Sequence, residues 1–68
     1  MPLTLPEQVE KLLSKKVRGK VHAAVENGSV ILSGSVRTFY EKQIAQEETK
    51  KLIASLRLQL HNQIKVEG

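Results

Sequence analysis

An Asn-Gly dipeptide between two alternating segments is the feature that most constrains the fold of this chain. Residues 20–26 and 29–36 each alternate apolar and polar side chains, and Asn27-Gly28 joins them. Asn-Gly is the preferred loop of a two-residue type I′ hairpin, because both central residues need a positive φ. The loop predicts that Glu26 faces Ser29, and this register places most apolar side chains on one face. We therefore predict a β-hairpin with strands at 20–26 and 29–36.

The predicted register divides the hairpin into an inward and an outward face. The inward face carries Val21, Ala23, Val25, Val30, Leu32 and Gly34. The outward face carries Lys20, His22, Ala24, Glu26, Ser29, Ile31, Ser33 and Ser35. Gly34 is the one inward position without a side chain, so we expect a helix to approach the sheet closely there.

Two helices are predicted, one before and one after the hairpin. Thr4 with Glu7, and Thr38 with Glu41, have the capping-box spacing of a helix start. Apolar residues then recur at helical spacing, which predicts helices over 5–16 and 39–55.

The second helix has an apolar stripe and an aromatic start. Its stripe is predicted to consist of Ala45, Thr49, Leu52 and Leu56. Phe39 and Tyr40 stand at its first positions. Membrane-interface anchoring is one interpretation of this pair, but we expect the two rings to seat the helix start on the core.

The last segment, residues 58–67, alternates again and predicts a third strand. Asn62 falls on its apolar parity, so we expect its side chain to be hydrogen-bonded, because an unsatisfied polar group costs about 1–3 kcal/mol. The order α-β-β-α-β predicts a two-layer α+β sandwich, with two helices on one face of a three-stranded mixed or antiparallel sheet. With 68 residues, the chain has room for one domain, spanning residues 1–68.

This layout resembles the BON domain, a family named for bacterial osmotic-shock and nodulation proteins. The family pattern V-x-V-x-x-G-x-V-x-L-x-G-x-V, a helix with small inward residues and V-x-N-x-I-x-V cover essentially the whole chain. The matching positions are Gly28, Val30, Leu32, Gly34, Val36, Ala45, Asn62, Ile64 and Val66. The resemblance implies a non-enzymatic binding module without agreed catalytic residues, attached to phospholipid membranes or other ligands and often found in the cell envelope.

The chain departs from the family pattern before the last strand. It reads Leu56-Arg57 where the family usually has Gly-Val. Without that glycine the second helix lacks its usual left-handed C-cap. We expect an altered exit turn, a longer helix or an exchanged last strand.

A basic stretch is the leading candidate for a binding site. Five of the eleven cations fall within ten residues: Lys11, Lys15, Lys16, Arg18 and Lys20. They could meet lipid headgroups, at about 1 kcal/mol per cation, nucleic-acid phosphates or an acidic protein, or they could be a solvated helix end that meets the C-terminal dipole. Nucleic acid is disfavoured because base stacking needs aromatic side chains on the open sheet face.

The outward face of the sheet is a second candidate. His22, Ala24, Ile31 and His61 lie on it, and a flat face centred on Ile31 and Ala24 could pair with a second copy or a protein partner. A strand edge offers the same kind of contact. The alternative is a polar, water-facing sheet.

Chemistry on this face is not expected. His22 and His61 with Glu26 or Glu67 lack a third fixed metal ligand. His22 opposite Ser33 lacks an orienting carboxylate and oxyanion donors. We therefore predict no catalytic residues, metal or cofactor, and a chain this short rarely builds an enzyme pocket.

The N-terminal sequence bears on where the protein is located. The N-terminus has no basic n-region and no apolar h-region, which predicts a cytoplasmic protein as the sequence stands. If the chain is part of a longer exported protein, the periplasm or cell envelope is expected instead. The longest apolar run, Val30-Ile31-Leu32, is far too short to cross a bilayer.

Overall fold

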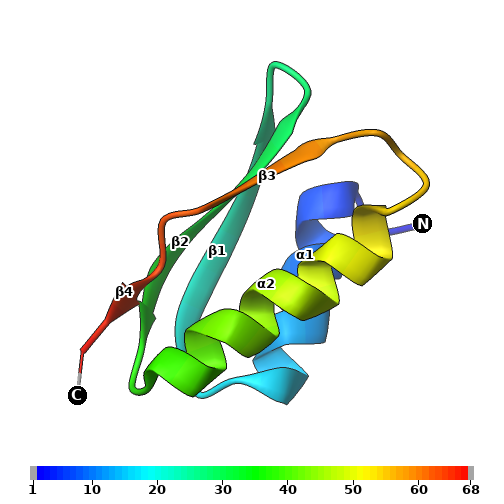
Figure 1. The fold of residues 1–68 in the computed structure, drawn as a ribbon. Coiled ribbons are helices and arrows are strands. Elements are labelled where there is room, and N and C mark those ends of the chain that lie inside the picture. Colours follow the sequence, from blue (N-terminus) through cyan, green and yellow to red (C-terminus); the bar gives the residue numbers. More distant parts are fainter. Residues whose placement is uncertain (1, 68) are drawn as a thin grey trace.

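The computed structural model describes residues 2–67, which form two helices and a mixed four-stranded sheet (Figure 1). The elements in chain order are α1 (Leu5–Lys16), β1 (Gly19–Glu26), β2 (Ser29–Val36), α2 (Phe39–Ile53), β3 (Gln59–Asn62) and β4 (Lys65–Val66). Both helices lie on one face of the sheet. This confirms the predicted α+β sandwich with one correction: the last predicted strand is divided into β3 and β4.

The hairpin has the predicted register. β1 pairs antiparallel with β2 from Glu26↔Ser29 beside the turn to Gly19↔Val36 at the far end. Asn27 and Gly28 have φ values of 48° and 77°, as a type I′ turn requires. The turn therefore sets which side chains of the hairpin face the helices.

Gly34 is required for a different reason from the one predicted. Its φ is +106°, and a Cβ added there would collide with the carbonyl oxygen of Lys20 in β1. The three nearest atoms belong to the paired strand, so it is β1, and not a helix, that first excludes a side chain at this position. Glycine is needed because any side chain would push β1 and β2 apart.

β2 is the central strand of the sheet. β3 and β4 pair with it in parallel, on the side opposite β1. The pairs Ser29↔Gln59 and Val36↔Val66 have the same offset, so the break between β3 and β4 adds no residue to the register. The last segment therefore runs along the whole length of β2 despite the break.

Asn62 explains the break. Its Oδ1 accepts a hydrogen bond from the backbone amide of Ile64 at 3.1 Å, which forms an Asx turn. Its Nδ2 donates to the carbonyl oxygen of Lys42 in α2 at 3.2 Å. The predicted hydrogen bonding of Asn62 is confirmed, and the same side chain ties β3 to α2.

The two helix starts differ. At α1 the full capping box forms between Thr4 and Glu7. The hydrogen bonds of Thr4 lower the pKa of Glu7, its side-chain hydroxyl contributing most. At α2 the Thr38 hydroxyl accepts from the Glu41 amide at 3.1 Å, and the Glu41 carboxylate also reaches the backbone between α1 and β1.

The end of α2 is a turn without glycine. α2 ends at Ile53, two residues before the predicted end, so the expected longer helix was wrong. Arg57 adopts φ +56°, the left-handed conformation that glycine usually supplies. The turn also removes Leu56 from the predicted stripe, since its side chain is 49% exposed. In the single chain described here, the last strand pairs with β2.

The core lies between the sheet and the helices. Its buried apolar residues are Val9, Leu13, Val17, Val30, Leu32, Val36, Ala45, Ile53 and Ile64. Thr49 is the buried polar residue among those described, and its hydroxyl donates to the carbonyl oxygen of Ala45 at 2.7 Å. This bond lets a polar side chain occupy the apolar stripe of α2.

Candidate functional site

The five predicted cations are all exposed and fall into two groups. Lys11 and Lys15 lie one turn apart on the outer face of α1. Lys16, Arg18 and Lys20 lie where α1 ends and β1 begins. The structure therefore divides the stretch, and only the second group lies at an end of the molecule.

Further cations join this second group from other segments. The pair Gly19↔Val36 brings Arg18 and Arg37 to the same end of the hairpin. Lys20 and Lys65 both pair with Ser35, from opposite sides of β2. Figure 1 shows the end of α1, the starts of β1 and α2, and β4 gathered at the lower end of the molecule. We call the five cations at this end the basic end: Lys16, Arg18, Lys20, Arg37 and Lys65.

Glu41 fixes the geometry of the basic end. Its Oε2 accepts a hydrogen bond from the backbone amide of Arg18 at 2.6 Å, and its Oε1 accepts one from the Thr38 hydroxyl at 3.1 Å. The Arg18 bond is the main reason that the pKa of Glu41 is lowered. Glu41 thus holds the α1–β1 connection against the start of α2, while the Arg18 side chain remains exposed.

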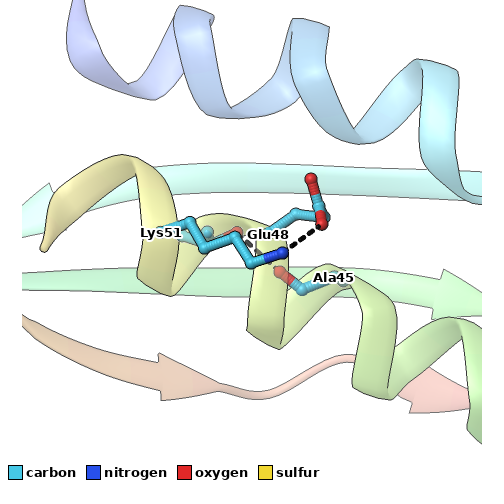
Figure 2. Close-up of polar contacts among 4 residues, drawn as sticks. Ala45, Glu48 and Lys51 are labelled. Carbon is cyan, nitrogen blue, oxygen red and sulfur yellow. Dashed lines mark hydrogen bonds and ion pairs between the residues drawn. The ribbon is translucent and has the colours of Figure 1, made fainter.

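The cations of the basic end form no ion pairs with the residues that the structure describes. Over residues 2–67, the single ion pair within 4 Å joins Lys51 and Glu48 on α2, at 3.5 Å (Figure 2). Its members are three residues apart on one helix and do not include a cation of the basic end. Among residues 2–67, no carboxylate competes with an external anion for these five cations through an ion pair.

Two aromatic side chains lie beside the basic end. Phe39 and Tyr40 are 63% and 70% exposed at the start of α2, so the expectation that they seat the helix on the core was wrong. A groove of about 200 Å³ adjoins Phe39 and is also lined by Lys42, Gln43, Gln46 and Glu47. Exposed rings two and three positions after Arg37 combine apolar and cationic surface at one end.

The open face of the sheet collects the second set of candidates. Ala24, Ile31 and His61 form one row across β1, β2 and β3. His22 lies in the next row, opposite Ser33. Ile31 is half-buried and the other candidates are exposed. Within residues 2–67, there is no group of three or more His, Cys, Asp or Glu side chains that could hold a metal ion.

The sequence reasoning missed three features of the basic end. Arg37 could have been found, because extending the hairpin register beyond Gly19↔Val36 places it beside Arg18. Lys65 depends on the parallel register of β4, for which the chain has no short-range signal. Phe39 and Tyr40 were assigned to the core because aromatic residues usually lie there.

Comparison with protein-family models, with curated proteins and with solved structures finds no match to this chain. Neither helix of the described residues has the length and apolar character that crossing a bilayer requires.

Proposed function

We propose that this chain is a BON-like, non-enzymatic binding module that attaches to anionic phospholipid surfaces through its basic end. The observation that carries the proposal is the meeting, at one end of the fold, of two exposed aromatic rings and five cations that form no ion pair with another residue of 2–67. Three positions that match the BON pattern have a physical role in the fold. Gly28 and Gly34 adopt positive φ values, and the side chain of Asn62 forms hydrogen bonds.

Charge and apolar surface act together in such a contact. Each cation near an anionic membrane contributes about 1 kcal/mol, and stable attachment generally takes two kinds of attraction. Phe39 and Tyr40 supply the second kind, since aromatic side chains favour the headgroup region. Nucleic acid is less favoured because Phe39 and Tyr40, the only aromatics of the chain, lie at the start of α2 and not on the open sheet face.

Cosedimentation with phosphatidylcholine vesicles, with and without phosphatidylglycerol, tests the proposal. We expect binding only to the anionic vesicles at low salt, and its loss near 1 M salt, where the Debye length is about 3 Å. Absence of binding at low salt would refute the proposal. A single-stranded oligonucleotide that binds more tightly than the vesicles would also contradict it and would identify nucleic acid as the partner.

Matched variants locate the contact. R18Q/R37Q removes two cations of the basic end and should weaken binding about 30-fold, from about 1 kcal/mol per cation. K50Q/K51Q removes two cations from α2, outside the basic end, and should change binding far less. Phe39→Ala with Tyr40→Ala should weaken binding about tenfold or more without unfolding the protein, because both rings are largely exposed. Equal losses in the two cation pairs would show that overall charge, and not the basic end, drives binding.

A further inference from the structure

The open face of the sheet has an ordered chemical pattern. The registers of β1, β3 and β4 with β2 place its side chains in four rows of three. From the turn toward the basic end, the rows are Glu26–Ser29–Gln59, Ala24–Ile31–His61, His22–Ser33–Gln63 and Lys20–Ser35–Lys65, where Gln63 continues the register between β3 and β4. The face is therefore acidic at one end, apolar near its middle and basic at the other end.

The β1 edge of the sheet is poorly suited to strand addition. At the middle of β1 the backbone amide of Ala23 donates to Oε2 of Glu10 in α1 at 2.9 Å, so a carboxylate occupies this edge. An added strand would have to displace that bond and would meet the charge of Glu10. Charged side chains at a sheet edge commonly prevent pairing with another strand.

The β3–β4 edge is also interrupted. The Asx turn of Asn62 takes the amide of Ile64, and β3 and β4 have only four and two residues. Short, broken edges pair poorly with other strands. Compared with the two strand edges, the open face is therefore the larger surface of the sheet that another molecule can cover.

We infer that a second copy of this chain covers the open face, with its strands antiparallel to those of the first. A two-fold axis parallel to the sheets and perpendicular to the strands would place the first row of one copy over the fourth row of the other. Glu26 of each copy then faces Lys20 of the other, so the contact is made twice. A parallel arrangement would instead place Lys20 over Lys65 and repel, which selects the antiparallel one.

The middle rows suit the same arrangement. Ile31 and Ala24 of one copy lie over the row of Ser33 and His22 of the other, so four apolar side chains meet near the axis. Stacked sheets lie about 10 Å apart, which small side chains such as Ala24 and the serines permit. The apolar area is small, so the dimer is expected to be weak and concentration-dependent.

Charge reversal tests this pairing through sedimentation velocity over a range of protein concentrations. E26K and K20E should each raise the dimer dissociation constant at least tenfold, because each places like charges opposite one another twice. The double variant K20E/E26K should restore dimers, since the pairing is re-formed with its signs exchanged. The matched pair E47K and K50E, on exposed positions of α2, should leave the dissociation constant unchanged.

Several outcomes would overturn the inference. Wild-type protein that stays monomeric at millimolar concentration would do so, and so would a double variant that fails to recover. Ile31→Lys, with folding checked by circular dichroism, should abolish the dimer, and persistence of the dimer would refute the proposed centre. The dimer can be tested separately from lipid binding. The variant K20E/E26K should regain the dimer, whereas its basic end still lacks the cation at position 20.

Discussion

Replacing Arg57 with glycine should stabilise the protein. Arg57 is exposed and has φ +56°, in the turn that leads from α2 to β3. In this conformation the Cβ of any L-residue crowds the backbone, which costs about 1–2 kcal/mol. The hydrogen bond from the Leu56 amide to the Ile53 carbonyl, at 2.9 Å, holds the preceding turn without the Arg57 side chain. Glycine would keep the turn and remove the crowding.

The expected gain in the free energy of unfolding is smaller than the cost of the crowding alone. Glycine loses more backbone freedom on folding, which offsets about 0.5–1 kcal/mol. The net increase in the free energy of unfolding is therefore about 0.5–1 kcal/mol. For a domain of this size, that corresponds to a rise in Tm of about 3–6 °C.

Urea denaturation followed by circular dichroism measures the effect. The midpoint should rise by about 0.5–1 M at unchanged slope. Arg57→Ala separates conformation from charge, because it removes the cation but keeps a Cβ, and it should leave the midpoint nearly unchanged. Ser55→Gly, at an exposed neighbour without a positive φ, should lower the midpoint. If Arg57→Gly lowers the midpoint as Ser55→Gly does, the explanation of this turn is wrong.

Three further predictions concern other parts of the fold. Gly34→Ala should destabilise the protein by about 3 kcal/mol or more, because both its φ and the Lys20 carbonyl oxygen oppose a Cβ; a near-neutral urea midpoint would contradict this. Asn62→Ala should cost about 1–3 kcal/mol by leaving the Ile64 amide without its partner, and retention of wild-type stability would show that the Asx turn is dispensable. The pKa of both Glu7 and Glu41 is lowered in the folded state, so their contribution is present above pH 4.5 and is lost as the pH falls through the folded pKa values. Urea midpoints between pH 7 and 3 should therefore fall in acid, less steeply in Glu41→Gln, and equal slopes would rule out this role of Glu41.

The hairpin shows how much of the fold the sequence could predict. Asn27-Gly28 restricts the turn to one type, and the turn determines every pair of β1 and β2, so local chemistry was sufficient there. The first helix was equally predictable, because the Thr4–Glu7 capping box lies next to a clear apolar periodicity. The strand order was not predictable, since the pairing of β3 with β2 depends on residues thirty positions apart in the chain.

The candidate site was predicted less completely. The basic stretch was visible because its cations are close in sequence, but the basic end combines side chains from several segments. Glu41 illustrates the difficulty, because its spacing from Thr38 predicted a capping box, whereas its carboxylate accepts from the Arg18 amide as well as from the Thr38 hydroxyl. A carboxylate at a helix start can satisfy whichever amide the tertiary fold brings near, and the local pattern does not contain that information.

The central position of β2 has a consequence for the order of folding. Its pairs with β1 are local and close through a two-residue turn, whereas every pair with β3 and β4 closes a loop of thirty residues. Loop closure of this length must precede any gain from the parallel pairs, so we expect the hairpin to form first and the docking of residues 59–66 to limit the folding rate. A nascent chain would expose one side of β2 until residues 59–66 are complete, and this strand is where misassembly would begin.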